Sequence, residues 1–417
     1  MKKLLALSLS VIMVLSMVGI AAADDGVVLK VVAWDVNTTT YYAAQKEAFE
    51  ASHPGITIEY VDVASQDYGT KTSTMLAGDD TSDIFMIKEV TDILNWNKAG
   101  YAEPLNAYIE RDGYDLSGFV GMESGYAFDG VQAGLPFRSD FWVLFYNKTL
   151  FDDAGVAYPT NDMTWEDYKD LAIKMTDASK GVYGCHYHTW LSAVVNWAVC
   201  DGVNTLVDGE YDDLAYFYNL YFDLAEAGAC MPYPETQAAG LHYSGAFGNG
   251  NIAILPMGYW YVSSLISNIQ NGTYEVKDWG ITAVPHKEGV PAGASFGNLT
   301  GAMINAKSAN KDAAWTYVAW LCGPEGAKAT ASTGNRPAWV SEDVASVMSS
   351  VEGFPTDEAS KAALLPSMVS IEIPGVDHAS EIKTILNEEH SAIITGEIPV
   401  DEGILNMNDR VAEVLGK

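Results

Sequence analysis

Aromatic and polar side chains follow several short apolar stretches of this chain. The clearest case is FGNGNIAILPMGYW at residues 247–260, where an apolar stretch breaks at Pro256 and Gly258 and ends in Trp260. Tryptophan belongs most often to a packed core, but at the mouth of a cleft its flat face can hold a ring that has an apolar face and polar edges. The residue types allow both interpretations of Trp260.

Ten further residues share this character, because each is a tryptophan, charged or amide side chain at a predicted strand end or in a loop. They are Trp34, Asp35, Lys88, Glu89, Arg138, Asp140, Trp190, Asn298, Asn335 and Arg336. In open α/β sheets, ligands bind beyond the carboxyl ends of the strands. Carbohydrate suits such a mixture, since its C–H faces stack on indole rings and its hydroxyls bond to carboxylates, amides and guanidinium groups. Single members have other interpretations: Trp34 can be core, and Arg138 with Asp140 can be a local ion pair.

The sequence carries no recognisable catalytic motif. It has no G-x-S-x-G elbow, no glycine-rich phosphate loop and no H-E-x-x-H helix. His186 and His188 would share one face of a strand, but no third metal ligand is evident, and the acidic clusters at 79–83 and 208–213 lack the register of a calcium loop. We therefore expect no metal, no cofactor and no enzyme. The 55 acidic residues still leave room for the carboxylate pair of a secreted glycosidase.

The N-terminus has the pattern of a secretory signal peptide. Lys2 and Lys3 precede an apolar run over 4–20, and three alanines end at Ala23. We expect residues 1–23 to be removed on export, with an uncleaved anchor as the alternative. The formal net charge of −32 would repel nucleic acid and anionic lipid, so neither is expected as a partner.

The chain has four cysteines, and export would place them in an oxidising compartment. A disulfide such as Cys185–Cys200 is allowed, and buried free thiols are an equal alternative for these two and for Cys230 and Cys322. Their spacings fit no zinc motif. No cysteine lies near the end of the signal peptide, so the usual lipid-attachment site is missing.

Strands and helices are predicted to alternate, which indicates an α/β fold with a largely parallel, helix-covered sheet. At 417 residues the chain is too long for one ordinary core, so we expect two domains. The apolar stretch at 135–148 is predicted to be one long strand that passes between them. Strands are expected at 28–34, 56–63, 82–88, 279–285 and 299–305, and helices at 41–51, 66–77, 164–177, 191–200, 214–227, 311–322 and beyond 341.

The order of these segments resembles the extracytoplasmic (family 1) solute-binding proteins of bacterial ABC sugar importers, the group that includes maltose-binding protein. The matching pieces include FEASHPGITIEYV (49–61), SDIFMI (82–87), LPFRSDFWVLFYNKTLFDDAGV (135–156), TWEDYKDLAIKMT (164–176), GNIAILPMGYW (250–260), WGITAVP (279–285) and KDAAWTYVAWLCGPEGAKATASTGNRPA (311–338). The resemblance implies a two-lobed periplasmic-binding-protein fold, similar to type II, with a ligand cleft between lobes joined by crossing strands. It divides the chain into an N-terminal lobe of residues 24–138 plus 279–322 and a C-terminal lobe of 139–278 plus 323–417.

The resemblance also implies roles for the candidate residues. Asp140 matches a cleft carboxylate that accepts sugar hydroxyls, Trp260 matches the aromatic platform, and Trp34 with Asp35 matches the polar and aromatic end of the first strand. Asn335 and Arg336 fall in a loop near the cleft. Lys88, Glu89, Trp190 and Asn298 match less closely.

The function that the resemblance implies is capture of a mono- or oligosaccharide and its delivery to the membrane permease of an ABC importer. The protein is expected to be a monomer, in the periplasm or outside the cell in association with the membrane. Another solute, such as a polyamine or a ferric ion, is the alternative within the same fold. A secreted carbohydrate-active enzyme and an adhesive surface module are the alternatives from other classes.

Overall fold

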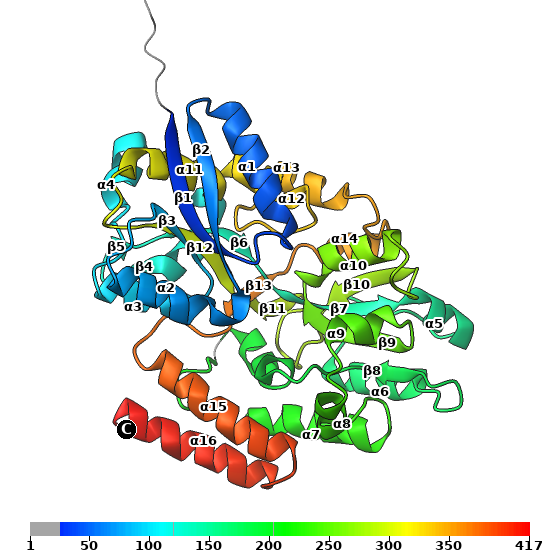
Figure 1. Cartoon of the computed structure of the whole chain (residues 1–417). Coiled ribbons are helices and arrows are strands. Elements are labelled where there is room, and N and C mark those ends of the chain that lie inside the picture. The colour runs from blue at the N-terminus through cyan, green and yellow to red at the C-terminus, as the bar shows by residue number, and fades with distance from the viewer. Residues whose placement is uncertain (1–25, 120, 203) are drawn as a thin grey trace, which may run out of the picture.

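The chain folds into two lobes, each built on one main β-sheet (Figure 1). The computed structural model describes residues 26–119, 121–202 and 204–417, so the expected signal peptide at 1–23 lies outside the described residues. Each sheet lies in a hydrophobic cluster of its own. The two predicted domains therefore correspond to two separate cores.

The first sheet has the order β2-β1-β3-β12-β6, with β1, β2 and β3 parallel and β12 antiparallel to both its neighbours. Helices between the first three strands allow this parallel pairing, because a parallel return needs a long crossover. The strands are β1 (Val27–Trp34), β2 (Ile56–Val63), β3 (Ile84–Ile87), β6 (Leu135–Ser139) and β12 (Leu299–Ile304), beside a small hairpin of β4 (Ala127–Phe128) and β5 (Val131–Gln132). The helices are α1 (Thr40–Ser52), α2 (Tyr68–Ala77), α3 (Val90–Lys98), α4 (Asn106–Asp112), α11 (Lys311–Cys322) and α12 (Pro324–Ala331).

The second sheet has the order β10-β7-β9-β8, in which β7 is antiparallel to both neighbours and β8 is parallel to β9. Its last two helices, α15 and α16, pack against each other, and α16 also contacts α7 (Figure 1). The strands are β7 (Trp142–Asn147), β8 (Tyr183–Cys185), β9 (Ile252–Gly258) and β10 (Trp279–Ala283). The helices are α5 (Lys148–Ala154), α6 (Trp165–Met175), α7 (Leu214–Glu226), α8 (Tyr233–Ala238), α9 (Tyr243–Gly248), α10 (Tyr261–Gln270), α13 (Glu342–Ser349), α14 (Glu358–Ala362), α15 (Ala379–Ile394) and α16 (Val400–Leu415).

The chain crosses between the lobes from β6 to β7 and again from β11 (Ala294–Gly297) to β12, and β11 pairs with β13 (Met368–Ile371). The two crossings touch at Gly297. A Cβ atom on this residue would lie 1.6 Å from the carbonyl oxygen of Asp140. Only glycine allows so close an approach of the two backbones, so the packing of the crossings depends on this residue.

Most of the predicted elements are present, but the structure differs from the expectation in three places. The stretch 135–148 is two strands rather than one, because it breaks at Asp140 and Phe141 where the chain leaves the first sheet. The expected helix at 191–200 is a pair of 3-10 helices, Leu191–Ala193 and Val195–Asp201, since the backbone of Val194 has a φ of −124° that no helix accommodates.

The third difference concerns the lobe boundaries. β10 pairs with β7, so residues 279–283 lie in the second sheet and not in the N-terminal lobe. α12 packs against α1 and α11, so this helix contacts the first lobe although residues 323–331 are expected in the second. The rest of the expected division stays a prediction.

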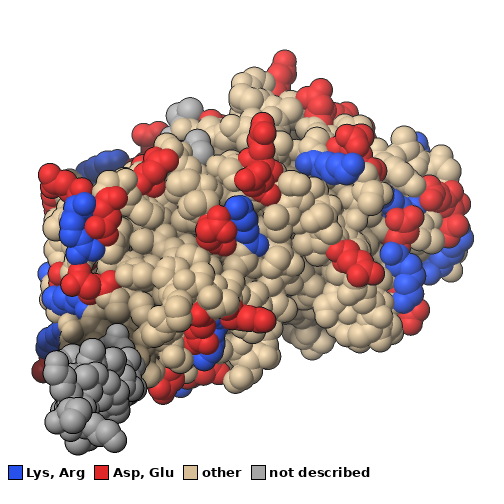
Figure 2. Space-filling model, turned by 90° about the horizontal axis from the view of Figure 1, so that it is seen from above, with Lys and Arg blue, Asp and Glu red and all other residues tan. Residues whose placement is uncertain are grey.

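Charged side chains of both signs are scattered over the face shown in Figure 2, where acidic groups lie among the basic ones without a large basic patch. The arrangement agrees with the net charge of −32. Within the described residues, none of the helices has the length and the apolar character needed to span a membrane.

Candidate functional site

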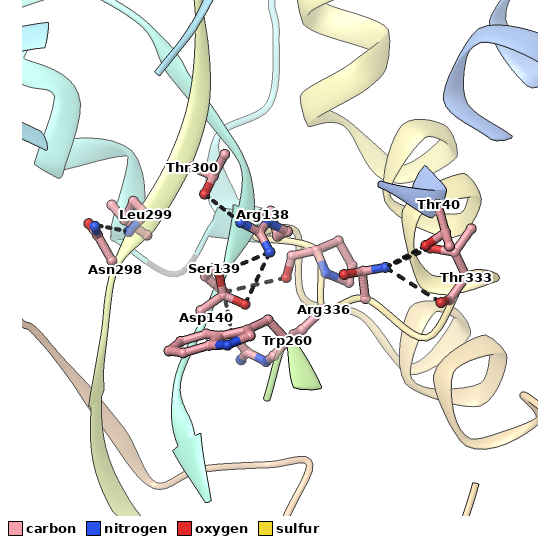
Figure 3. Close-up of polar contacts among 12 residues, drawn as sticks. Thr40, Arg138, Ser139, Asp140, Trp260, Asn298, Leu299, Thr300, Thr333 and Arg336 are labelled. Atoms are coloured by element: carbon pink, nitrogen blue, oxygen red, sulfur yellow. Dashed lines mark hydrogen bonds and ion pairs between the residues drawn. The ribbon is translucent and has the colours of Figure 1, made fainter. Parts of the chain in front are cut away.

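A buried cluster of charges lies where the chain first crosses between the lobes (Figure 3). Arg138, at the end of β6, and Asp140 are two residues apart, and their side chains form an ion pair with 3.1 Å between Nη1 and Oδ2. Arg138 also donates from Nη2 to the hydroxyl of Thr300 on β12, at 3.1 Å. Asp140 is only 6% exposed. Arg138 and Asp140 are therefore an ion pair, and that pair lies at the junction of the two lobes.

Arg336 is the third charge of this cluster. Its guanidinium donates to the Ser139 hydroxyl and lies over the Phe141 ring, 4.8 Å from the centroid. Burial lowers the pKa of Arg336 to about 10, so the group keeps its proton at neutral pH. Burial also raises the pKa of Asp140, an effect that the two arginines oppose. Two guanidinium groups thus surround one carboxylate in a poorly solvated place.

The cluster retains hydrogen-bonding capacity. Among the described residues, the Nε atom of Arg138 is buried without a hydrogen-bond partner. A buried donor without a partner costs free energy, so a ligand hydroxyl that reached it would satisfy it. The cluster can therefore bind a hydroxyl group through a donor as well as through the oxygens of Asp140.

Trp260 lies directly after β9, and its ring packs over the backbone of Gly258. A Cβ atom on Gly258 would come within 1.9 Å of the indole ring, so any larger residue at this position would displace the ring. The indole N–H donates to the hydroxyl of Tyr243 at 3.3 Å. Asp140 is close enough for its charge to act on the pKa of Tyr243, and Figure 3 shows its carboxylate beside the Trp260 ring. Trp260 is therefore half-buried next to the charge cluster.

Trp190 extends this aromatic surface. Its ring centroid lies 6.4 Å from that of Trp260 and 5.6 Å from that of Tyr243, and 41% of the residue is exposed. By contrast, the two tyrosines that flank Trp260, Tyr259 and Tyr261, have no exposed surface. Trp190 and Trp260 are thus the rings of this region that a ligand can reach.

Trp34 belongs to the core of the first lobe. It is 7% exposed and makes edge contacts with Tyr42 and Tyr68 at centroid distances of 6.3 and 5.0 Å. Of the two interpretations of Trp34, the structure supports packing.

Asp35 and Lys88 both bind Ser65, the first residue of the 3-10 helix Ser65–Asp67 that follows β2. Asp35, with a left-handed backbone at φ 48°, accepts a hydrogen bond from the Ser65 N–H at 2.9 Å. Lys88 donates to the carbonyl and hydroxyl oxygens of Ser65, both at 2.7 Å. These two polar side chains therefore order a loop at the strand ends, and a ligand contact from either stays a prediction.

Glu89 and Asn298 lie together in a small polar cavity of about 90 Å³. Asn298 donates to Glu89 at 3.0 Å, and its carbonyl oxygen accepts from the Asp140 N–H at 3.0 Å, so the cavity adjoins the charge cluster. Glu372 and Lys383 line the same cavity. Burial and the nearby Glu89 raise the pKa of Glu372 to about 7. Glu372 was not predicted from the sequence, because a single acid in a stretch with weak strand character carries no signal.

Asn335 lies at a contact between the lobes. It donates to the hydroxyls of Thr333, at 3.0 Å, and of Thr40 at the start of α1, at 3.3 Å. The Thr40 hydroxyl is also 3.4 Å from the hydroxyl of Ser263 on α10. Thr40 and Ser263 were not predicted from the sequence, since 223 residues separate them and each is unremarkable in its local context.

The described strand ends and crossings thus gather Arg138, Asp140, Arg336, Trp260 and Trp190 into one region, with Glu89 and Asn298 adjoining it. A family model of bacterial extracellular solute-binding proteins matches residues 34–328. The chain belongs to this family. The resemblance noted in the sequence is confirmed, and the chain is a solute-binding protein rather than an enzyme.

Solved structures agree with this family. A sugar transporter from Rhizobium etli in an open conformation is 40% identical, with a TM-score of 0.85 over 93% of this chain and 99% of that chain. A maltose-bound MalE3 of T. maritima is 17% identical and has a TM-score of 0.75 over 93% of this chain and all of the other, which shows the fold alone. The two-lobed α/β fold is therefore confirmed.

Curated relatives are more distant. A putative binding protein of Brucella abortus is 26% identical over 318 residues, which cover 72% of this chain and 73% of the relative. An erythritol/L-threitol-binding protein of Mycolicibacterium smegmatis is 25% identical over 325 residues, covering 69% of this chain and 64% of the relative.

Two further features of the solute-binding protein are a second cavity and two buried histidines, of which His188 makes an edge contact with Trp190 at a centroid distance of 4.4 Å. A cavity of about 270 Å³ is lined by Phe141 and Trp142 and by residues of β10, β11 and α14, but by none of the residues expected in the site. Burial lowers the pKa of His186 and of His188 to about 4, so both imidazoles are neutral at pH 7. Among the described residues no group of three or more His, Cys, Asp or Glu side chains is arranged to hold a metal ion.

Proposed function

We propose that this solute-binding protein is an extracytoplasmic receptor for a sugar or polyol, which it binds between its lobes and delivers to an ABC permease. The observation that carries the proposal is the buried Arg138–Asp140 pair at the lobe crossing, with the reachable rings of Trp260 and Trp190 on the second lobe nearby. Charged hydrogen-bonding groups and aromatic rings, the two kinds of group that bind carbohydrate, are therefore present in one region.

The chemistry of the cluster supports a neutral, hydroxyl-rich ligand. Asp140 can accept hydroxyl protons, whereas Arg138 and Arg336 can donate to hydroxyl oxygens, and an indole face stacks on the C–H face of a sugar. A polyamine fits less well, because two guanidinium groups outnumber the single carboxylate at the centre of the cluster. Two relatives are named for polyols: one is the erythritol/L-threitol-binding protein, and the other is a mannitol-binding protein of Pseudomonas aeruginosa that is 24% identical over 139 residues.

Ligand binding is coupled in this proposal to closure of the lobes. The crossings β6–β7 and β11–β12 are the segments about which the lobes would rotate, and the hydroxyl contact between Thr40 and Ser263 is made between the lobes. A ligand that contacts both lobes favours the closed state by its differential affinity, and the permease would recognise that state. The receptor acts as a monomer, in the periplasm or outside the cell in association with the membrane, and does not bind nucleic acid.

The test is a thermal-shift screen of residues 24–417 against mono- and oligosaccharides, sugar alcohols, polyamines and ferric ion. A ligand that binds only the folded state raises the Tm by mass action, so one sugar or polyol should give a clear shift. The solution is then incubated overnight and analysed for products, of which we expect none. A shift with spermidine or iron alone, or consumption of the sugar, would contradict the proposal.

A further inference from the structure

Two of the four cysteines lie side by side in the second lobe. The chain leaves β8 at Cys185 and returns through α7 to Cys230, and the Cys185 N–H donates to the carbonyl of Ala229 at 2.9 Å. This hydrogen bond holds residues 229–230 beside the end of β8. Backbones joined by such bonds lie about 4.8 Å apart, as in neighbouring strands, which is within the Cα separation of roughly 4.4–6.8 Å that a disulfide spans.

The side chains agree with the backbone. The Cys185 side chain is close enough to Cys230 to raise the pKa of the Cys230 thiol, and both cysteines are free and buried in this structure. The remaining two cysteines have other surroundings. Cys322 donates to the carbonyl of Leu135 in the first lobe at 3.4 Å, and the charged neighbours of Cys200 are Asp201 and Lys287. The thiol partner of Cys185 is therefore Cys230.

We propose that Cys185 and Cys230 form a disulfide when the chain folds in an oxidising compartment. The proposal rests on the export that the proposed function requires. In the reaction each thiol loses its proton, the two sulfur atoms together give up two electrons, and one S–S bond forms between them. The oxidant is a disulfide compound, such as glutathione disulfide, whose own S–S bond breaks to give two thiols. Because both side chains are buried in the folded lobe, the bond forms before β8 and the segment after α7 have packed.

The bond would close the chain over residues 186–229. This segment begins with His186 and contains Trp190, the more exposed ring of the candidate site. Joining the two ends of the segment restricts the unfolded chain and fixes the base of the loop that carries Trp190. We therefore expect the bond to raise the Tm by several degrees. The gain comes from restricting the unfolded chain, because the native contacts of the site are the same with and without the bond.

The test uses the full receptor lacking the other two cysteines, C200A/C322A. It is refolded from the reduced, denatured state in glutathione buffer, then denatured without reductant and alkylated. We expect both remaining thiols to be protected, and treatment with reductant to expose both. Labelling of both thiols after oxidative refolding would overturn the proposal.

The wild-type protein shows which cysteines pair. Trypsin cannot separate them, because no Lys or Arg lies between Lys180 and Lys277. Cleavage after glutamate is informative, since Glu210 and Glu226 separate Cys230 from a fragment that keeps Cys185 and Cys200 together. We expect a two-chain fragment that contains Cys230, and the same two-chain fragment from C200A/C322A, in which Cys200 cannot be the partner. A Cys185–Cys200 link, which stays within one fragment, would contradict the proposal.

The function test is kept separate from the redox test. If the disulfide forms and no sugar or polyol shifts the Tm, the proposed ligand class is wrong and the disulfide stands. If a sugar binds and all four thiols are labelled, the ligand class stands and the disulfide is wrong. The C185S variant in the C200A/C322A background should show one reactive thiol and a Tm that no longer responds to reductant.

Discussion

The carboxylate of Asp140 is 3.1 Å from the guanidinium of Arg138, and this ion pair is buried at the crossing between the lobes. Pairing satisfies a charge that would otherwise be expensive to bury. Because the crossing joins the two lobes, the ion pair lies next to both of them. Asp140 is therefore expected to contribute to stability as well as to ligand binding.

Replacing Asp140 with Asn should lower both the affinity and the stability. The substitution leaves Arg138 and Arg336 without their carboxylate, and breaking a buried ion pair from one side costs about 3 kcal/mol. Sugar affinity should fall roughly tenfold or more, since a charge-assisted hydrogen bond is lost. Urea unfolding and calorimetric titration measure the two effects.

A matched control is Asp357→Asn, which breaks the ion pair of Asp357 with Lys148 at 2.8 Å, away from the candidate site. This variant should lose stability and keep its affinity. If Asp140→Asn also keeps its affinity, Asp140 is a structural ion-pair partner only.

Truncating the two reachable tryptophans should separate stacking from packing. Trp260→Ala and Trp190→Ala each remove an indole face, and we expect a loss of about 1–3 kcal/mol of binding free energy for Trp260 and a smaller loss for Trp190. Trp190 is 41% exposed, so its truncation should leave the Tm nearly unchanged.

Tyr216→Ala serves as the control for these variants, because Tyr216 is also exposed, at 36%, but lies on α7 away from the site. Its affinity should match that of the wild type. Unchanged affinity of Trp260→Ala would mean that Trp260 serves only in core packing.

Gly258 offers an independent test of the Trp260 ring position. A methyl group at residue 258 would meet the indole 1.9 Å away, so Gly258→Ala must displace the ring and should reproduce the affinity loss of Trp260→Ala. Gly245→Ala is the matched control, because a Cβ atom there meets nothing within 4 Å and helix α9 favours alanine over glycine. Ligand titration of both variants measures the affinity, and tryptophan fluorescence reports whether the Trp260 ring has moved. Equal affinity in the two variants would mean that the ring position is unimportant for binding.

Local sequence patterns were sufficient for much of the fold. β1, β2 and β9 are continuous apolar or alternating runs, and Thr164 with Asp167 forms the capping box that starts α6. What the patterns could not show depends on tertiary contacts. The break at Asp140 arises where the chain changes sheets, so neither neighbouring strand signals it.

The sequence likewise predicted only part of the candidate site. The types and strand-end positions of Asp140 and Trp260 were informative, because such residues are unusual beside apolar strands. Burial of Trp34 against Tyr42 and Tyr68 could not be read from its position, since a strand end faces either the core or a cleft. The contact between Thr40 and Ser263 joins residues from opposite lobes, and only the folded chain brings them together.

Glu372 should make the stability of the receptor depend on pH near neutrality. Burial and then Glu89 raise its pKa to about 7 in the folded state, above the ordinary glutamate value of about 4.3 in the unfolded chain. Between these two values the folded protein holds a proton that the unfolded chain has lost. The contribution of this group to stability therefore decreases as the pH rises from about 4 to 7, and levels off above pH 7.

The Glu372→Gln variant removes this titration and keeps the shape of the side chain. Urea unfolding at pH 5, 6, 7 and 8 should show that the variant gains stability relative to the wild type as the pH rises, and the difference should stop growing above pH 7. The comparison cancels the contributions of the other groups with shifted pKa values, such as Asp92 and His390, because both proteins contain them. A constant difference between wild type and Glu372→Gln from pH 5 to 8 would mean that Glu372 titrates as an ordinary solvated carboxyl.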